Sequence, residues 1–317
     1  MNRKEVREIL DAPIDNLPNL LDAAYRIRRH YHGNRVKLCM LLNAQSGQCP
    51  EDCFYCSQAK DSEAPIQKYR LMRPDQMLVK ARQAVQAGAK RFCIVCSGTG
   101  PNDRIIDQMG SAVQMIKNEF PWLEICTSLG IMSLEKASKL KEAGVGWINH
   151  NLNTSERYYE KICTTHTYQD RVNTVNNVKA AGLQTCSGGI IGMGETVEDV
   201  IDFLFTVQKM DMDSIPINFL YPVEGTPLGN RPTLDPIFSL KVLCLARLMN
   251  PSKEVRVAGG RELNLKGLQM LALYPANSIF VEGYLTTPGT AADETRRFIE
   301  NCGFEVEEAK IPEEVHA

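Results

Sequence analysis

The sequence predicts an α/β fold, a TIM-type (β/α)8 barrel with an extra helical segment at its N-terminus. Two observations lead to this prediction. Short apolar segments alternate with amphipathic stretches of roughly 10 to 15 residues, a pattern typical of a parallel sheet covered by helices. This alternation repeats about eight times in a chain of 317 residues, the number of units in a closed barrel.

The elements follow one another in a regular order. The stretch up to His32 is expected to be helical, because Leu20, Leu21, Ala24 and Ile27 recur at helical spacing. Predicted strands then cover 36–42, 91–95, 123–126, 147–149, 183–191, 215–220, 254–257 and 278–281. Predicted helices cover 74–86, 103–118, 133–144, 168–181, 196–209, 236–249, 263–273 and 291–301.

Helix boundaries are marked by residues with known terminal preferences. Pro74 opens a helix and Ser133 caps another, while Gly88 and Gly182 follow helix ends. Eight units predict a closed barrel with its active site at the C-terminal ends of the strands; a doubly wound open sheet is the competing arrangement. We expect a single domain over 1–317, with a helical extension 1–34, a core barrel 35–285 and a C-terminal helical segment 286–317.

Composition excludes several classes of function. The net charge of -2 gives no basic field for nucleic acid or an anionic membrane. No apolar run approaches the roughly 18 residues that cross a bilayer, and Met1 to Asp11 is polar, unlike a secretory signal. We therefore expect a cytoplasmic protein. Eleven cysteines with uneven spacing point to metal or redox chemistry in a reducing compartment.

The most specific motif is Cys49-Pro-Glu-Asp-Cys53-Phe-Tyr-Cys56, which follows the first predicted strand. Iron–sulfur clusters are normally held by four thiolates. Three thiolates at this spacing would hold a four-iron cluster with one iron open to another ligand. The alternative is structural zinc, but zinc needs four ligands and no second cysteine pair lies nearby.

This motif resembles the cluster loop of the radical S-adenosylmethionine (SAM) superfamily, in which an aromatic residue, here Tyr55, precedes the third cysteine. The resemblance implies a [4Fe–4S] cluster whose open iron binds SAM, the source of a 5′-deoxyadenosyl radical. Gly188, Ile190, Gly192 and Glu195 match the superfamily's Gly-x-Ile-x-Gly-x-x-Glu pattern near the adenine. From the residues alone, a tight strand-to-helix turn explains these glycines equally well.

Amides cluster in Asn149-His-Asn-Leu-Asn153, at the end of the fourth predicted strand. Amides suit a sugar with vicinal hydroxyls, but a helix-capping loop is an equal alternative. In biotin synthases, a family within the superfamily, a similar stretch contacts the SAM ribose and the substrate. This implies cofactor roles for Asn151 and Asn153, although many members carry Asp at the second position.

A second set of thiols is dispersed over three predicted strands. Cys93, Cys126 and Cys186, with Arg256 on another strand, can meet inside a barrel, because alternate residues point inward. Each cysteine alone is more simply a small buried hydrophobe. Their local sequences resemble the biotin synthase segments that ligate an auxiliary [2Fe–2S] cluster. That resemblance, and not the spacing, implies Arg256 as a ligand.

The resemblance to biotin synthases extends from Lys37 to Phe304. It implies sulfur insertion into dethiobiotin as the last step of biotin biosynthesis, with sulfur from the auxiliary cluster. It further implies that Asn151 and Asn218 hold the ureido ring and that Thr286 and Thr287 lie near the carboxylate. A homodimer is expected, with reduced flavodoxin or ferredoxin as electron donor.

The sequence departs from the family at Gln45, where some members carry Lys, and at Cys96, an extra thiol near Cys93. Cys96 is either a spare buried thiol or a sign of a different auxiliary cluster. Cys39, Cys163, Cys244 and Cys302 have no assigned role. The alternative functions are another radical SAM enzyme, such as a hydrogenase-cluster maturase, and a metal carrier. Product identity and cofactor cleavage distinguish them.

Overall fold

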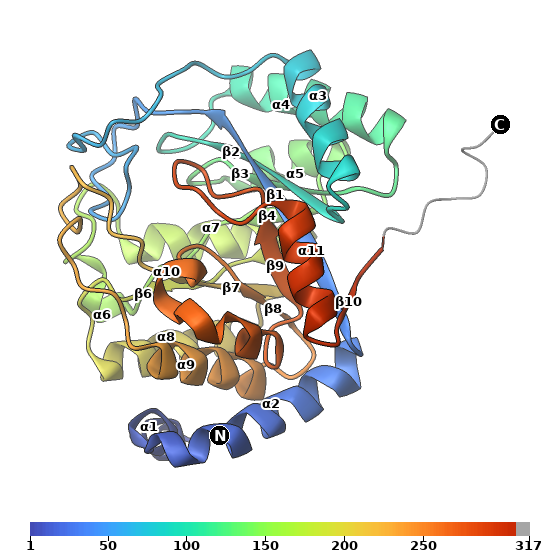
Figure 1. Cartoon of the computed structure of the whole chain (residues 1–317). Helices are drawn as coiled ribbons and strands as arrows, with labels where there is room; N and C mark the ends of the chain where they lie inside the picture. The colour runs from blue at the N-terminus through green and yellow to red at the C-terminus, as the bar shows by residue number, and fades with distance from the viewer. Residues whose placement is uncertain (309–317) are drawn as a thin grey trace.

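A closed parallel barrel forms the centre of the computed structural model, which describes residues 1–308 (Figure 1). The sheet closes because the last barrel strand pairs with the first, Lys37 opposite Ser278. The barrel strands are β1 (Arg35–Gln45), β2 (Arg91–Cys96), β3 (Glu124–Ser128), β4 (Trp147–Asn149), β5 (Gln184–Cys186) with β6 (Gly189–Ile191), β7 (Ser214–Phe219), β8 (Glu254–Val257) and β9 (Ser278–Val281). The predicted barrel is confirmed, and the open doubly wound sheet is excluded by the β1–β9 pairing.

Helices cover the outside of the barrel, and two large apolar layers lie between them and the strands. The outer helices are α3 (Pro74–Gln86), α4 (Asp103–Glu119), α5 (Leu134–Glu142), α7 (Tyr168–Ala180), α8 (Val197–Lys209), α9 (Pro236–Met249) and α11 (Ala292–Asn301). Their ends follow the sequence signals: Pro74 begins α3, and the Ser133 side chain accepts a hydrogen bond at the start of α5. Strands buried on both faces explain the continuous apolar runs of the sequence.

Two predicted elements are interrupted in the structure. The strand expected over 183–191 is split into β5 and β6, and both pair with β7. The helix expected over 263–273 is a short α10 (Arg261–Leu265) followed by a 3-10 segment, Lys266–Leu273. Lys266 has a φ of 50°, which an α-helix cannot continue through. Both breaks depend on local backbone conformation, which hydrophobic periodicity does not report.

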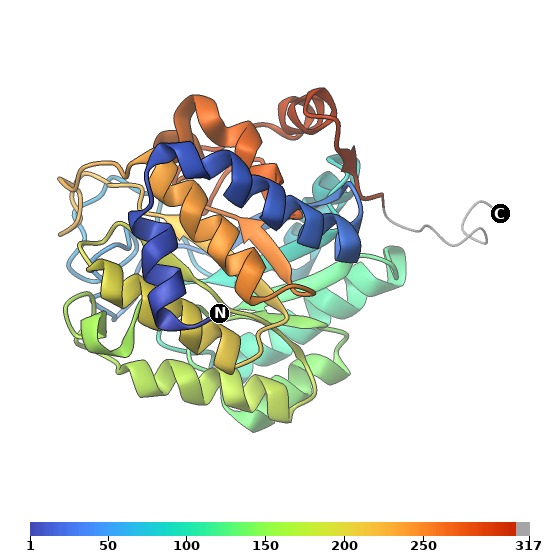
Figure 2. The ribbon, with the colours of Figure 1, turned by 90° about the horizontal axis from the view of Figure 1, so that it is seen from below.

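The N-terminal segment is two helices, α1 (Arg3–Asp11) and α2 (Leu17–His32), and not one continuous helix. A 3-10 turn, Ile14–Asn16, separates them. They bury apolar side chains such as Leu10 and Leu21 and lie against α8 and α9. Figure 2 shows them in blue across the outside of α9. The extension therefore covers the outer helices α8 and α9, and none of its residues lines the cavity described below.

Near its C-terminal end the chain pairs again with β1. The two-residue strand β10 (Glu305–Val306) pairs in parallel with β1 at Arg35, and a short helix, α6 (Glu156–Tyr159), precedes α7. Neither was expected from the sequence. The C-terminal segment predicted over 286–317 continues into 309–317, which lies outside the described residues. No helix in the described part of the chain has the length and apolar character of a membrane span.

Candidate active site

One cavity of about 380 Å³ lies at the C-terminal ends of the barrel strands. It gathers most of the residues singled out by the sequence. Those lining it are Cys49, Cys53, Tyr55, Cys56, Cys93, Asn151, Asn153, Ile190, Asn218, Arg256, Thr286 and Thr287. Cys126, Cys186, Gly188, Gly192 and Glu195 are not among the described lining residues.

The first cysteine loop follows β1 and is fixed by a segment more than a hundred residues later in the chain. Phe54 donates its backbone N–H to the carbonyl of Ile162 at 2.9 Å. The Asp52 carboxylate accepts the backbone N–H of Thr164 at 2.9 Å and that of Thr165 at 3.2 Å. Although burial opposes the charge, hydrogen bonds from the hydroxyl and backbone N–H of Thr164, the Cys163 thiol and the Thr165 hydroxyl hold the pKa of Asp52 well below its usual value. Asp52 thereby anchors the loop as a carboxylate.

The three loop thiols face the cavity. Cys53 is buried, whereas Cys49 and Cys56 are half-buried. Burial raises the pKa of Cys49 and of Cys56. Without a metal the thiols are therefore protonated at neutral pH, and metal binding would release their protons.

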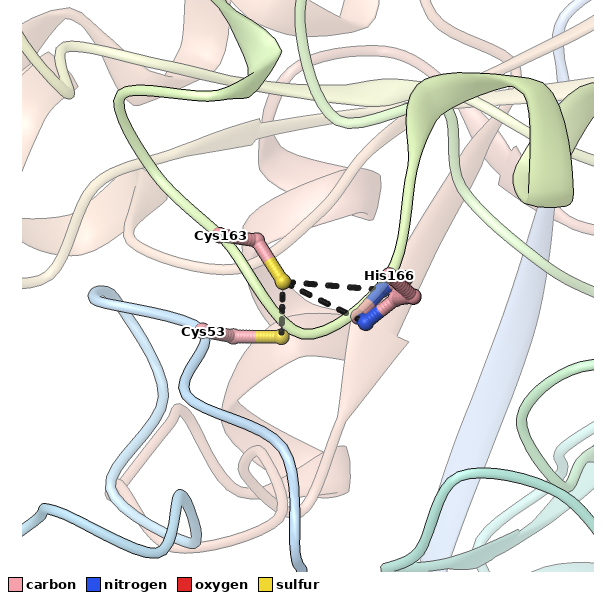
Figure 3. A group of neighbouring side chains, drawn as sticks. All are labelled: Cys53, Cys163 and His166. Atoms are coloured by element: carbon pink, nitrogen blue, oxygen red, sulfur yellow. Dashed lines mark hydrogen bonds between the residues drawn. The ribbon is translucent and has the colours of Figure 1, made fainter.

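Cys163 and His166 were missed as site residues by the sequence interpretation. The Cys53 thiol donates to Cys163 Sγ at 3.8 Å, and Cys163 Sγ lies 3.2 Å from His166 Nδ1 (Figure 3). The contact from Cys53 and the hydrogen bond with His166 lower the pKa of Cys163. The same contact with Cys163, together with burial, raises the pKa of Cys53. The available signal was a cysteine and a histidine three residues apart, because both side chains are common metal ligands.

The second set of thiols meets inside the barrel. Cys93 and Cys126 are register partners on β2 and β3, and their sulfurs are 3.2 Å apart. Cys186 packs in the same cluster, and Arg256 donates from Nη1 to its sulfur at 3.5 Å. Burial raises the pKa of Cys126, and the neighbouring Cys126 together with burial raises that of Cys186. Cys96 belongs instead to the apolar layer outside the strands, apart from the other three, and it also borders the cavity.

A buried ion network lies beside these thiols. Arg91 donates from Nη1 and Nη2 to the two carboxylate oxygens of Glu254, at 2.8 and 3.0 Å, and Arg256 also contacts Glu254. Despite burial, Arg91, Arg256 and Lys37 hold the pKa of Glu254 well below its usual value. Although burial lowers it, the neighbouring Cys39 and Glu254 raise the pKa of Arg256 well above its usual value. The guanidinium is therefore cationic in this arrangement.

The glycine-rich segment shapes the backbone around the cavity. A Cβ at Gly188 would lie 1.8 Å from the carbonyl oxygen of Pro216 on β7, so contact with the neighbouring strand requires glycine there. Glu195 accepts the backbone N–H of Gly192 at 2.6 Å through Oε1. Its buried Oε2 has no hydrogen-bond partner among the described residues, and burial raises the pKa of Glu195. Ile190 alone of the four matched residues reaches the cavity.

The amide side chains hold the strand ends together. Asn151 Oδ1 accepts the backbone N–H of Gly188 at 3.1 Å. Asn153 has a φ of 72°, a conformation that Asn tolerates better than most residues. Asn218 donates to the Gly189 carbonyl and accepts from the Gly259 N–H, each at 3.0 Å. The amides of Asn151 and Asn218 are thus oriented by backbone groups at the cavity rim, and the amide of Asn153 by the Tyr55 hydroxyl.

The segment after β9 reaches the cysteine loop. The hydroxyls of Thr286 and Ser57 are 2.7 Å apart, and Thr287 also lines the cavity. Gln45, at the end of β1, donates to the Ser97 carbonyl at 2.9 Å. The barrel mouth is therefore bordered by segments from both ends of the chain.

The donor chemistry fits two iron–sulfur clusters. Three thiols on one loop face a cavity, the arrangement expected where a cluster leaves one iron for another ligand. Three more thiols and a guanidinium converge deeper in the barrel, shielded from solvent. Thiolates are the usual ligands of such clusters.

Comparison with known proteins agrees with this chemistry. Residues 45–207 match the Radical SAM superfamily, and residues 216–305 match the Biotin and Thiamin Synthesis associated domain. The chain is 51% identical to the biotin synthase of Geobacillus kaustophilus (strain HTA426) over 310 residues, covering 98% of this chain and 93% of that protein. It is 50% identical to the biotin synthase of Bacillus subtilis (strain 168) over 304 residues, covering 96% and 90%.

The fold has a counterpart among solved structures. A crystal structure of methylornithine synthase superposes with a TM-score of 0.83 at 23% identity, covering 97% of this chain and 94% of that one. At this identity the likeness shows the fold alone. Together with the full-length matches to the curated relatives, the site shows that the chain belongs to the biotin synthase family of the radical SAM superfamily.

Proposed function

We propose that this enzyme converts dethiobiotin to biotin by radical SAM sulfur insertion, the last step of biotin biosynthesis, with sulfur from an auxiliary iron–sulfur cluster. One observation carries the proposal. Two separate groups of thiols converge on one barrel: Cys49, Cys53 and Cys56 at the mouth, and Cys93, Cys126 and Cys186 inside. Cofactor cleavage alone would need only the first group.

Membership of the superfamily implies a [4Fe–4S] cluster and SAM as cofactors. When bound, they supply a 5′-deoxyadenosyl radical for hydrogen abstraction from an unactivated carbon. In our assignment Cys49, Cys53 and Cys56 ligate the cluster. Tyr55, Asn151, Asn153, Gly188, Ile190, Gly192 and Glu195 form the SAM site. Gly188, Gly192 and Glu195 would act there through backbone shape, since they do not line the cavity.

The auxiliary cluster is assigned as [2Fe–2S], held by Cys93, Cys126, Cys186 and Arg256. The support is the 3.2 Å separation of two sulfurs and the 3.5 Å contact from Arg256 to the third. Arg256 is held as a cation beside Glu254. To ligate iron the guanidinium would have to lose a proton, which the surrounding buried ion network would have to accept.

In our assignment the substrate would lie between the two groups of thiols. Asn151 and Asn218 would bind the ureido ring, and Thr286 and Thr287 the carboxylate. Asn218 is already oriented by two backbone hydrogen bonds, which lowers the entropic cost of presenting its amide. Thr286 and Ser57 close the rim next to the cysteine loop, which would keep water away from a reactive radical.

The remaining assignments concern the oligomeric state, the electron donor and the cellular compartment. We propose a homodimer of single-domain chains, divided as 1–34, 35–285 and 286–317. Reduced flavodoxin or ferredoxin would deliver electrons. The cytoplasm is the proposed compartment, because eleven free thiols suit a reducing environment.

The test uses anaerobically purified full-length protein reconstituted with iron and sulfide. Dithionite, SAM and dethiobiotin are added, and 5′-deoxyadenosine and biotin are measured by mass spectrometry. We expect both products from the wild type, neither from Cys53→Ala, and 5′-deoxyadenosine without biotin from Cys126→Ala. The matched control Cys244→Ala removes a buried thiol far from the site and should give both products. Normal biotin formation by Cys126→Ala would disprove the auxiliary-cluster role.

A further inference from the structure

Three potential metal ligands converge behind the cysteine loop, and only one of them, Cys53, has a role in the proposed biotin-forming reaction. Cys53 comes from the loop after β1, while Cys163 and His166 come from the segment between α6 and α7 (Figure 3). One ligand atom of each lies within 4.8 Å of the other two. Both cysteines are buried, and His166 is half-buried. Thiolates with an imidazole are the donor set preferred by zinc and ferrous iron.

The distances match a tetrahedral centre. Two thiolates at about 2.3 Å from a zinc ion are about 3.8 Å apart at the tetrahedral angle. The sulfurs of Cys53 and Cys163 are 3.8 Å apart without any metal. His166 Nε2 lies 3.8 Å from Cys163 Sγ, where a zinc-bound nitrogen at about 2.0–2.1 Å would lie about 3.5 Å from that sulfur. The ligand atoms of His166 and Cys53 lie within 4.8 Å of each other, so the ring must move closer to Cys53 to complete the centre.

Glu51 is placed to orient the imidazole. Its Oε2 is 2.7 Å from His166 Nδ1, so a neutral ring donates its Nδ1 proton to Glu51 and leaves Nε2 as an acceptor. A carboxylate on the far nitrogen of a ligating histidine is the usual supporting arrangement at metal sites. Arg171 donates from Nη2 to His166 Nε2 at 2.9 Å, and a metal would displace this contact. Arg171 would still donate to the Asn151 carbonyl at 2.9 Å.

The surrounding charge favours a cation. Glu51 and Asp52 both face the three ligands, and Asp52 Oδ1 accepts from the Cys163 thiol at 3.3 Å. Arg171 is the one cation in direct contact with them among the described residues. Two carboxylates and two thiolates outweigh one guanidinium and a divalent ion. The site therefore does not bury uncompensated positive charge.

We propose that the chain, before its cluster is assembled, binds one thiophilic divalent metal ion through Cys53 Sγ, Cys163 Sγ and His166 Nε2, with Glu51 as the positioning residue. Both sulfurs bind as thiolates, so any thiol proton that they carry is released on binding, and no redox step is involved. The ion and the four-iron cluster would exclude one another because both use Cys53, a consequence that rests on the proposed function. The metal site itself does not.

The binding test titrates reduced, metal-free, full-length protein with Co²⁺ under anaerobic conditions, followed by competition with Zn²⁺. The thiolate-to-cobalt charge-transfer band reports thiolate ligation. Cys163→Ser is compared with Cys49→Ser, a matched change in the cluster loop that leaves the three ligands intact. We expect one tight site in wild type and Cys49→Ser, and Co²⁺ affinity at least about 100-fold lower in Cys163→Ser, since losing even a supporting residue costs 10–100-fold.

Two further variants keep the test independent of any one substitution. His166→Ala should weaken binding as Cys163→Ser does, and Glu51→Gln should weaken it about 10–100-fold. Circular dichroism checks that each variant is folded. If Cys49→Ser lost the site and Cys163→Ser kept it, the ion would be held by the cluster-loop cysteines, and our assignment would be overturned. Equal affinity in all variants would overturn it as well.

A reconstitution experiment separates this proposal from the proposed function. Stoichiometric Zn²⁺ is added before iron and sulfide, and [4Fe–4S] formation is followed by visible absorbance and by electron paramagnetic resonance after reduction. We expect Zn²⁺ to slow cluster formation in wild type and to have little effect in Cys163→Ser. Failure of wild type to form a cluster without Zn²⁺ would count against the proposed function alone. If Zn²⁺ inhibited cluster formation equally in both proteins, the ion would not act through a site that contains Cys163 and shares Cys53 with the cluster.

Discussion

Asn153 Nδ2 donates a 2.6 Å hydrogen bond to the hydroxyl of Tyr55, joining the loop after β4 to the cysteine loop after β1. The two residues are 98 positions apart in the chain. Asn153 is only 2% exposed and adopts a φ of 72°. This hydrogen bond therefore holds Tyr55, the residue just before Cys56, in position. The buried Asn153 amide that donates it comes from the loop after β4.

Loss of this hydrogen bond should lower the free energy of unfolding, and the loss should be larger when a buried polar group is left without a partner. Tyr55→Phe leaves a buried amide without its acceptor, which should lower the free energy of unfolding by about 1–3 kcal/mol. Asn153→Asp should be tolerated, because Asp also adopts positive φ and can accept from the Tyr55 hydroxyl. Asn153→Leu should be worse than both. Thermal melts and the SAM dissociation constant would rank the variants, and equal behaviour of Asp and Leu would contradict this account.

The buried ion network beside the inner thiols should be sensitive to loss of its acceptor. Glu254→Gln removes the charge that pairs with Arg91 and Arg256; Arg91 keeps its contact with Glu124, whereas Arg256 is left buried without a carboxylate partner among the described residues. We expect destabilisation of about 3–5 kcal/mol. Glu119→Gln, which breaks the exposed pair with Arg82, is the matched control and should change the melting temperature little. Similar shifts for the two variants would show that the network is not important for stability.

Glycine at position 188 should be indispensable for folding. In Gly188→Ala the new Cβ would meet the Pro216 carbonyl oxygen on β7, a backbone atom that cannot move aside. We expect loss of soluble folded protein. Gly267→Ala, where no atom lies within 4 Å of the added Cβ, should alter the free energy of unfolding by no more than about 0.5 kcal/mol. Yield and melting temperature provide the measurement.

Asp199 should make stability depend on acid pH. Although burial opposes it, hydrogen bonds from Thr196, Ser155 and Arg157 lower the pKa of Asp199 from 3.8 to about 2. A carboxyl with a lowered folded-state pKa contributes stability that is present above its unfolded pKa and is lost as pH falls through the folded pKa. Its contribution, on the order of 2 kcal/mol, should be complete above about pH 5 and decline between about pH 4 and 2.

The comparison variant for this effect is Asp199→Asn. The difference in melting temperature between wild type and Asp199→Asn should be largest near neutral pH and should shrink below pH 4. A difference that stayed constant down to pH 2.5 would mean that the amide and the carboxylate differ in packing and not in charge.

Periodicity and contiguous motifs determined much about this protein from sequence alone. Eight alternations of strand and helix predicted a closed barrel. The prediction was possible because the hydrophobic periodicity of a helix or a strand is a local property of the sequence. Three cysteines within eight residues predicted a cluster loop without any knowledge of the fold. The dispersed Cys93, Cys126 and Cys186 needed a family resemblance, since only strand register makes them neighbours.

Only the tertiary structure decided contacts that depend on long-range geometry. Cys163 lies 110 residues from Cys53, and nothing local to either predicts that their sulfurs meet. The division of β5 from β6 follows from the close approach of Gly188 to β7, and β10 is too short to carry a periodic signal. Such residues are neighbours only in the folded barrel, so their pairing is a property of the folded chain and not of any segment.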